Sequence, residues 1–268
     1  MNEDYFKANK KLWDEYARIH YESDNYNVKE FLSGETTLKP YELKELTEVK
    51  GKSLLHLQCH FGLDTLSWAR EGAIVTGVDF SDVGIRKAKS LAKEVNINAN
   101  FICSNIYDLP EVLHEKFDIV YTSIGVICWL PDLKRWAEII AYYLKPGGIF
   151  YFAEIHPYSM VFDEEHKKEL TIKYDYFYKP EPLKFINEGG TYAVPDAEIH
   201  QETYEWQHSV SEILNALIQA GLQLEYFNEF PFTCYKAFPF AEKEKDDNYY
   251  LKNQKAEIPL LLTLKARK

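Results

Sequence analysis

The stretch SLLHLQCHFG, residues 53–62, decides the fold of this chain of 268 residues. It opens with a short apolar run that is typical of a buried strand, and it closes with a glycine that leads into a helical stretch. The apolar and β-branched run AIVTGVDF, residues 73–80, predicts a second strand, and Ser81 is a suitable N-cap for the helix after it. A strand, a helix and a second strand at this spacing indicate a βαβ unit with parallel strands.

The same alternation continues along the chain. Further strands are expected at residues 99–104, 117–123 and 149–155, and a helix is expected at 131–144. We therefore predict a doubly wound α/β core over residues 51–155. A later helix and two later strands are expected at 209–220, 222–230 and 258–266.

Two segments lie outside this core. Residues 4–22 carry apolar side chains at roughly helical spacing among many charges, so residues 1–50 are expected to form an N-terminal helical lid. Residues 156–208 break the alternation, because prolines and glycines separate the strand-like pieces TIKYDYFY, GTYA and ETYEWQ. We predict that they form an antiparallel β cap inserted into a main domain of residues 51–268.

The composition excludes several kinds of protein. Apolar residues make up 46% of the chain and charged residues 27%, as in ordinary soluble globular proteins. The 42 acidic residues outnumber the 31 basic ones, and this negative charge disfavours a nucleic-acid partner. The chain has four cysteines without a CxxC pair, a polar N-terminal stretch and no apolar run of membrane-spanning length. We therefore expect a cytoplasmic protein with reduced thiols that binds neither nucleic acid nor a membrane.

Candidate ligand contacts cluster where the first three strands end, because ligands of open α/β sheets bind beyond the carboxyl ends of the strands. The loop QCHFG, residues 58–62, follows the first strand, and the helix after it offers free backbone amides. Asp79 ends the second strand 17 positions after Gly62, which suits a carboxylate that binds the two hydroxyls of a ribose. Asn105 and Ile106 end the third strand, where an adenine edge would lie.

Two cofactor classes use this geometry. A dinucleotide needs several glycines, so that the backbone can approach its pyrophosphate. Here Gly62 is the only glycine of the loop, and the side chain of His60 would obstruct a pyrophosphate. S-adenosylmethionine has no phosphate and needs a ribose acceptor, an adenine slot and polar groups for its amino-acid end. The residues therefore favour S-adenosylmethionine over a nicotinamide dinucleotide, and with it a transferase over an oxidoreductase.

A longer series of motifs resembles a known family: LLHLQCHFG, GVDFS, SNIYDLP, FDIVYTSIGV and LKPGGIFYFAEIHP. Their order over residues 53–155 resembles that of class I S-adenosylmethionine-dependent methyltransferases, and more narrowly a bacterial subgroup of small-molecule type that carries LHLQCHFG. The resemblance implies a Rossmann-like, doubly wound seven-stranded sheet of order 3-2-1-4-5-7-6, with strand 7 antiparallel. It also implies direct transfer of a methyl group from S-adenosylmethionine to a small-molecule acceptor, with S-adenosylhomocysteine as product.

The resemblance also implies cofactor contacts by position. The loop from Gln58 through His60 to Gly62 corresponds to the part that wraps the methionine end of the cofactor. The other implied contacts are Asp79 for the ribose, Phe80, Asn105 and Ile106 for the adenine, and Ser123, with Ile124 and Gly125, near the methyl group.

The chain departs from the family pattern at three positions. His56 replaces the usual acidic residue of the first strand, and Gln58 and His60 replace the first two glycines of the loop. The subgroup carries the same residues, which favours an altered methionine clamp. The other interpretation is a degenerate site, in a regulatory protein that binds S-adenosylmethionine or S-adenosylhomocysteine without catalysis. His56 itself is expected to be a core residue, and a metal at the two histidines is disfavoured because they lie on a strand and a turn.

Catalytic candidates follow from position alone. Glu154 and His156 flank the end of the fifth strand, on the substrate side of this architecture, and His208 precedes a helix. Each is a candidate base, with an ion pair or a helix cap as the structural alternative. Asp64, in the first turn after Gly62, either complements the helix dipole or contacts the amino group of the cofactor. The reacting atom of the acceptor (O, N, S or C) and the oligomeric state stay open.

Aromatic residues are concentrated outside the core. They make up 12 of the 100 residues from 51 to 150, but 7 of 27 from 5 to 31, 10 of 49 from 158 to 206 and 9 of 25 from 226 to 250. These three segments would cover the carboxyl ends of the strands, so we expect an aromatic-lined acceptor pocket, with a purely structural cluster as the alternative. Together with the acidic balance, this predicts a small apolar or cationic acceptor under a lid.

Overall fold

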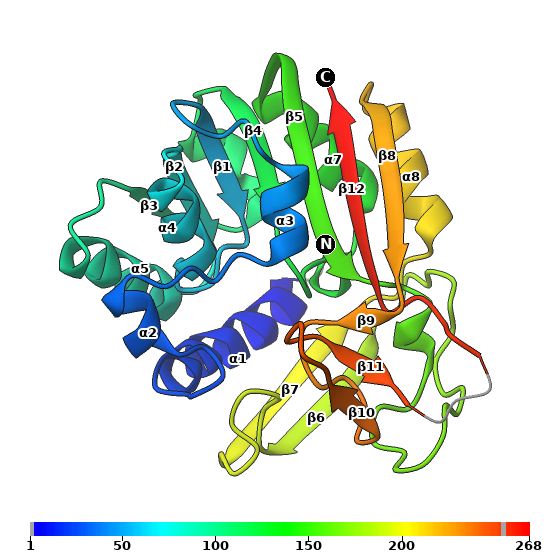
Figure 1. Ribbon diagram of the computed structural model, residues 1–268. Coiled ribbons are helices and arrows are strands. Elements are labelled where there is room, and N and C mark those ends of the chain that lie inside the picture. Colours follow the sequence, from blue (N-terminus) through cyan, green and yellow to red (C-terminus); the bar gives the residue numbers. More distant parts are fainter. Residues whose placement is uncertain (1–2, 253–255) are drawn as a thin grey trace.

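The fold is built on a seven-stranded sheet in the computed structural model, which describes residues 3–252 and 256–268. The strands lie in the order β3-β2-β1-β4-β5-β12-β8, which are Asn100–Cys103, Ile74–Asp79, Ser53–Leu57, Phe117–Thr122, Leu144–Ile155, Leu261–Arg267 and Gln223–Phe230. Strands β3, β2, β1, β4 and β5 are parallel, and β12 is antiparallel to both its neighbours (Figure 1). The predicted doubly wound sheet, its strand order and its antiparallel strand are therefore confirmed.

Helices cover both faces of the sheet (Figure 1). One face carries α3, α4 and α5 (Pro40–Glu45, Leu63–Arg70 and Asp82–Glu94), and the other carries α6, α7 and α8 (Leu109–Val112, Leu133–Tyr143 and Val210–Gln219). Strand β5 serves both layers, because alternate side chains of a strand point to opposite faces. Phe150 and Phe152 pack with Trp136 of α7. Tyr151, between them, packs in the cluster that contains Trp68 of α4.

The N-terminal segment lies across the carboxyl edge of the sheet. It contains α1 and α2, which are Glu3–Tyr21 and Val28–Ser33. Asp14 fixes α1 to α5, since its carboxylate accepts the hydroxyl of Ser81 at 2.6 Å and the backbone N–H of Val83 at 3.1 Å. Asn9 fixes α1 to the inserted segment, because its side-chain amide donates to the carbonyl of Tyr204 at 2.7 Å and accepts the N–H of the same residue at 2.9 Å.

The inserted segment forms an antiparallel hairpin of β6 (Leu183–Gly189) and β7 (Ile199–Glu205), as expected of a β cap. Two expected strands are absent from it. Residues 171–178 form a single bridge, between Ile172 and Phe162, because most of this stretch is exposed and has no partner strand. Residues 190–193 form the hairpin connection instead, where Thr191 N–H donates to the carbonyl of Val194 at 2.9 Å.

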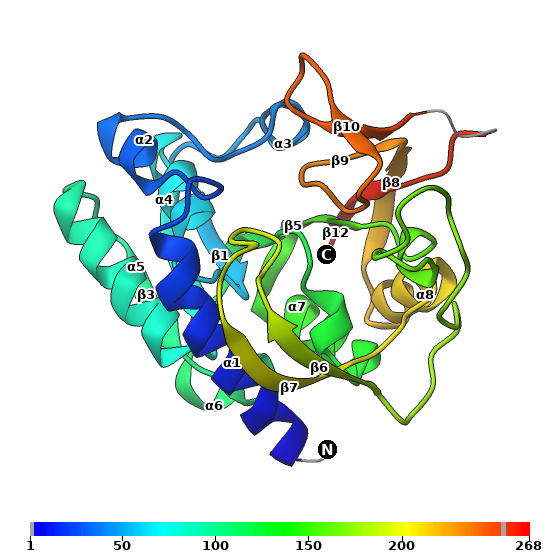
Figure 2. The ribbon, with the colours of Figure 1, turned by 90° about the horizontal axis from the view of Figure 1, so that it is seen from below.

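A second small sheet, not predicted from the sequence, joins this cap. Its strands are β9, β10 and β11, which are Phe232–Thr233, Ala241–Lys243 and Tyr249–Leu251. Seen from below the sheet, α1 and the β6–β7 hairpin lie side by side across the strand ends, and β9 and β10 lie along the far edge (Figure 2). Within residues 3–252 and 256–268, no helix has the length and apolarity to span a bilayer.

Candidate functional site

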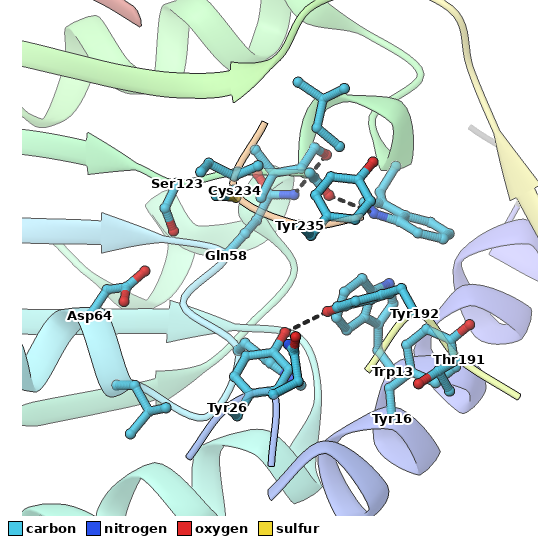
Figure 3. Close-up of a pocket in the computed structure, with 18 of the residues that line it drawn as sticks. Trp13, Tyr16, Tyr26, Gln58, Asp64, Ser123, Thr191, Tyr192, Cys234 and Tyr235 are labelled. Carbon is cyan, nitrogen blue, oxygen red and sulfur yellow. Dashed lines mark hydrogen bonds between the residues drawn. The ribbon is translucent and has the colours of Figure 1, made fainter. Parts of the chain in front are cut away.

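A cavity of about 1110 Å³ lies at the carboxyl edge of the parallel strands. The loops after β1, β2, β3 and β4 line one side of it, and the N-terminal segment, the hairpin and the β9–β11 sheet line the other (Figure 3). The residues expected to contact the cofactor all line this cavity: Gln58, His60, Gly62, Asp79, Phe80, Asn105, Ile106 and Ser123, together with Ile124 and Gly125. The structure thus brings together residues from four strand ends.

The loop after β1 has an unusual backbone conformation. Gln58, His60 and Gly62 have φ angles of 59°, 51° and 83°, in the left-handed region that favours glycine. Gln58 and His60 replace glycines of the resembled family, so the loop keeps a glycine-like path and gains two side chains. Backbone bonds hold it in place, from Cys59 N–H to Val78 O at 2.9 Å and from Gly62 N–H to Cys59 O at 2.9 Å.

Asp79 ends β2 with its carboxylate against this loop. One oxygen accepts the backbone N–H of His60 and the other accepts that of Ser81, both at 2.8 Å. Burial raises the pKa of Asp79 to about 7, although these two N–H groups act against the shift. A carboxylate has about four acceptor positions, so about two remain for donors from a ligand. This arrangement suits the two hydroxyls of a ribose.

Several polar atoms at the cavity wall have no partner among the described residues: Gln58 Oε1, both ring nitrogens of His60, and Trp13 Nε1. The His60 ring lies edge to face with the rings of Trp13 and His20, at centroid distances of 5.2 and 5.6 Å. Burial lowers the pKa of His60 well below its usual value, so the neutral ring offers one donor and one acceptor. Buried polar atoms without partners fit a polar ligand such as the amino-acid end of S-adenosylmethionine.

Asp64 and Ser123 lie near each other at one end of the cavity (Figure 3). Asp64 accepts a hydrogen bond from Thr37 Oγ1 at 2.5 Å, and burial raises its pKa. The hydroxyl of Ser123 bonds to Nε2 of His56 at 3.0 Å, and the other ring nitrogen of His56 bonds to Thr65 Oγ1 at 2.8 Å. His56 is therefore a buried core residue with both nitrogens satisfied, as expected.

No metal-binding group of three His, Cys, Asp or Glu side chains is found in the part of the chain that the structure describes.

Glu154, expected as a candidate base, does not line the cavity. The backbone N–H groups of residues 125, 126 and 127 donate to its carboxylate, which thereby holds the loop after β4. Burial raises the pKa of Glu154 to about 7, against the effect of these donors. Glu154 lies at the end of β5 as expected, but its side chain binds the loop after β4 and does not face the cavity.

His156 and His208 also lie outside the cavity lining. Nε2 of His156 bonds to the carboxylate of Glu229 at 2.8 Å, and its Nδ1 accepts the backbone N–H of Tyr158 at 3.1 Å. Nε2 of His208 bonds to the carbonyl of Leu130 at 2.7 Å. The structure therefore corrects the expectation that these histidines face the acceptor, because backbone and ion-pair partners occupy both side chains.

Aromatic side chains from all three segments outside the core line the cavity: Trp13, Tyr16, Tyr26, Tyr174, Phe185, Tyr192 and Tyr235. Figure 3 shows Trp13, Tyr16, Tyr26, Tyr192 and Tyr235 around it. The hydroxyls of Tyr26 and Tyr192 hydrogen-bond to each other. His20 Nε2 and Thr191 Oγ1 form a second bond at 3.0 Å between the same two segments. The expected aromatic lining under a lid is therefore present.

Glu164 and Glu205 are among the carboxylates of the lining that sequence reasoning missed. Glu164 follows β5 in the insertion, and Glu205 ends β7. Neither belongs to a motif, and both reach the cavity only because the insertion folds over the strand ends.

Part of the chain is similar to known proteins. Residues 55–152 match the family described as "Methyltransferase domain". Over 122 residues, 44% of this chain, the sequence is 35% identical to a ubiquinone biosynthesis O-methyltransferase of Coxiella burnetii (strain Dugway 5J108-111), and the match covers 51% of that enzyme. The chain thus spans about half the length of this enzyme and of its counterpart in another Coxiella burnetii strain.

Two solved structures share the fold over most of the chain. An S-adenosylmethionine-dependent methyltransferase from Mesorhizobium loti has a TM-score of 0.58 at 21% identity, covering 88% of this chain and 100% of that one. Another, from Clostridium acetobutylicum, has a TM-score of 0.58 at 15% identity, covering 96% and 98%.

The sheet order and the cavity at its carboxyl edge define the class I S-adenosylmethionine-dependent methyltransferase fold. Residues 55–152 match a methyltransferase domain, and the two solved structures that share this fold are of S-adenosylmethionine-dependent methyltransferases. The resemblance drawn from the sequence motifs is confirmed.

Proposed function

We propose that the protein is an S-adenosylmethionine-dependent methyltransferase that acts on a small molecule. One observation carries this proposal: the loop of residues 58–62 and Asp79 present free, buried donors and acceptors where this fold binds its cofactor. When bound, S-adenosylmethionine supplies a methyl group on a positively charged sulfur that leaves as a neutral thioether.

The residues around the loop would hold the cofactor. Asp79 would bind the ribose, and Phe80 would lie beside the adenine, with Asn105 and Ile106 at its edge. Gln58 and His60 would bind the amino-acid end through their unpaired atoms, and Ser123 would lie near the methyl group.

The cap would exclude water and align the acceptor. Small-molecule sites occupy about 300–1,000 Å³, so a cavity of about 1110 Å³ has room for the cofactor and a small acceptor together. The matched domain ends at residue 152, before the insertion and the β9–β11 sheet. The name of the Coxiella burnetii relative suggests an oxygen atom as the methyl acceptor. However, the insertion and the β9–β11 sheet, which line the acceptor side of the cavity in this chain, lie outside the matched domain.

A ligand series in thermal unfolding tests the proposal. A ligand at about 100 times its Kd adds about 2.7 kcal/mol to the stability of the folded state. We expect S-adenosylmethionine and S-adenosylhomocysteine each to raise the Tm by several degrees, and NAD to leave it unchanged. Stabilisation by NAD, with no effect of either adenosyl compound, would refute the proposal and support an oxidoreductase.

A further inference from the structure

The carboxylates of Glu164 and Glu205 line the part of the cavity near the ends of β4 and β5. Glu205 is fixed there by its neighbour Trp206, whose backbone N–H donates to the carbonyl of Cys128 at 2.8 Å, in the turn of residues 127–129 after β4. Glu164 lies in the insertion after β5, which ends at Ile155. Asp79, by contrast, ends β2, so this pair lies on the side of the sheet away from the expected adenosine contacts.

Neither carboxylate has a hydrogen bond or an ion pair with any described residue. Lys173 also lines the cavity, but its ammonium group pairs with Asp163 at 3.0 Å. Burial, and after it the charge of Glu164, raises the pKa of Glu205 to about 8, which places the two carboxylates within electrostatic range of each other. Glu205 is partly buried, whereas Glu164 is more exposed and also feels the charge of Lys173. A bound organic cation would favour the ionised form of both carboxylates.

Two tyrosines, Tyr16 and Tyr235, line the same cavity and interact electrostatically with this pair. Burial raises the pKa of Tyr16 to about 12, and the charges of Glu205 and Glu164 add to the shift. Burial also raises the pKa of Tyr235, with Glu164 as the next contribution. Both tyrosines line the cavity and extend into it from opposite sides (Figure 3). Aromatic faces beside carboxylates attract organic cations rather than anions.

We propose that the acceptor is a small organic amine, which binds as its ammonium ion between Glu164, Glu205 and the two tyrosines. This inference rests on the proposed methyl transfer and names its substrate class. A carboxylate of the pair takes a proton from the ammonium nitrogen. The freed lone pair forms the N–C bond to the methyl carbon, the electron pair of the broken C–S bond stays on sulfur, and the carboxyl group later releases its proton to water.

Two alternatives to an ammonium ion need to be considered: a phenolate acceptor and the sulfonium group of the cofactor itself. A phenolate acceptor, the nucleophile of O-methylation, would meet two carboxylates in an enclosed site and be repelled. The sulfonium of the cofactor is another cation that the two carboxylates could stabilise. S-adenosylhomocysteine has a neutral sulfur, so measurements in its presence report on the acceptor alone.

The test is binding of three matched probes to the protein saturated with S-adenosylhomocysteine, by calorimetry or ligand-observed NMR. The probes are 2-phenylethylammonium, 2-phenylethanol and phenylacetate. We expect the ammonium ion to bind about tenfold more tightly than the alcohol, and phenylacetate more weakly than either. In the variant with Glu164→Gln and Glu205→Gln together, the ammonium ion should bind no better than the alcohol.

Glu202→Gln is the matched control, because Glu202 lies on the same strand but is exposed and pairs with Lys184. It should keep the preference for the ammonium ion. Absence of ammonium binding, equal binding of the alcohol, or an unchanged preference in the double variant would overturn the inference. S-adenosylhomocysteine binding is measured in every variant as a check on folding. If it fails in the wild type, the proposed function fails; if it holds without an ammonium preference, the amine inference alone fails.

Discussion

At the scale of single residues, Gly62 is constrained in two ways. Its φ of 83° lies in the left-handed region, and a Cβ atom there would come within 2.8 Å of two ring carbons of Phe101 and 3.0 Å of Ala88 Cβ. Gly147 has a similar φ of 78°, but a Cβ atom there would meet no atom within 4 Å. The two glycines therefore separate the cost of backbone strain from the cost of crowding.

Alanine at each position should reveal that difference in urea unfolding. Gly147→Ala should cost about 1–2 kcal/mol, the cost of a left-handed residue with a side chain. Gly62→Ala should cost about 1–3 kcal/mol more, because the added methyl group also overpacks the core against Phe101. Equal losses in the two variants would show that the loop after β1 has room for a side chain and that its path is not fixed by packing.

The sequence predicted which residues meet at the cavity below the first strands, because their position in the sheet decides this. Residues that end parallel strands, such as Asp79 and Asn105, meet at one edge of any such sheet. The same rule places Glu154 and His156 at the end of β5, but it does not say which way their side chains point. A residue at a strand end faces the site only if its side chain has no closer partner, and the backbone N–H groups after β4 and the carboxylate of Glu229 are such partners.

At the scale of elements, the loop after β4 depends on a carboxylate from β5. Glu154 accepts three consecutive N–H groups of that loop, which also contributes Ile124 and Gly125 to the cavity lining. The role of Glu154 is therefore to hold the shape of the loop, and a substitution of Glu154 should mainly lower the stability of the folded protein.

Glu154→Gln tests this role. The amide replaces one acceptor oxygen with a donor that faces backbone N–H groups, so we expect a loss of about 2–4 kcal/mol in the free energy of unfolding. Glu138→Gln, on the exposed face of α7, should change it by less than about 0.5 kcal/mol. A Glu154→Gln protein as stable as the wild type, but inactive, would instead support the base role expected from position.

The same scale explains which elements could be predicted. The core strands are buried on both faces, so their apolar runs stand out in the sequence. The stretch of residues 171–178 instead alternates polar and apolar side chains, is mostly exposed and forms no strand. Strands β9, β10 and β11 have two or three residues each, too few for any periodicity to show.

At the scale of the whole molecule, the negative charge seen in the composition has a counterpart inside the cavity. The chain has a formal net charge of −11, and burial raises the pKa of both Glu42 and Asp79, two carboxyls of the cavity lining, to about 7. The lid and the insertion, which no motif describes, enclose these groups. The fold and the cofactor side were therefore predictable from local patterns, whereas the acceptor side depends on how distant segments close over it.

Because Asp79 is enclosed in the cavity, its protonation gives a test of whether it binds the ribose of the cofactor. Its pKa in the free protein is raised from 3.8 to about 7, so the carboxyl group is mostly protonated below that pH. Ribose hydroxyls that donate to the carboxylate favour its ionised form and lower that pKa. Binding should therefore release a proton and become tighter as the pH rises toward the pKa of the free protein.

The most direct measurement is a calorimetric titration of the protein with S-adenosylhomocysteine at about pH 5.5 and about pH 7.5. We predict that the wild type binds on the order of tenfold more tightly at the higher pH. Asp79→Asn should bind on the order of tenfold or more weakly at that pH and lose the pH dependence, whereas Asp108→Asn, an exposed control, should behave as the wild type. No binding by the wild type, or unchanged affinity and pH dependence in Asp79→Asn, would contradict the assignment of Asp79 to the ribose.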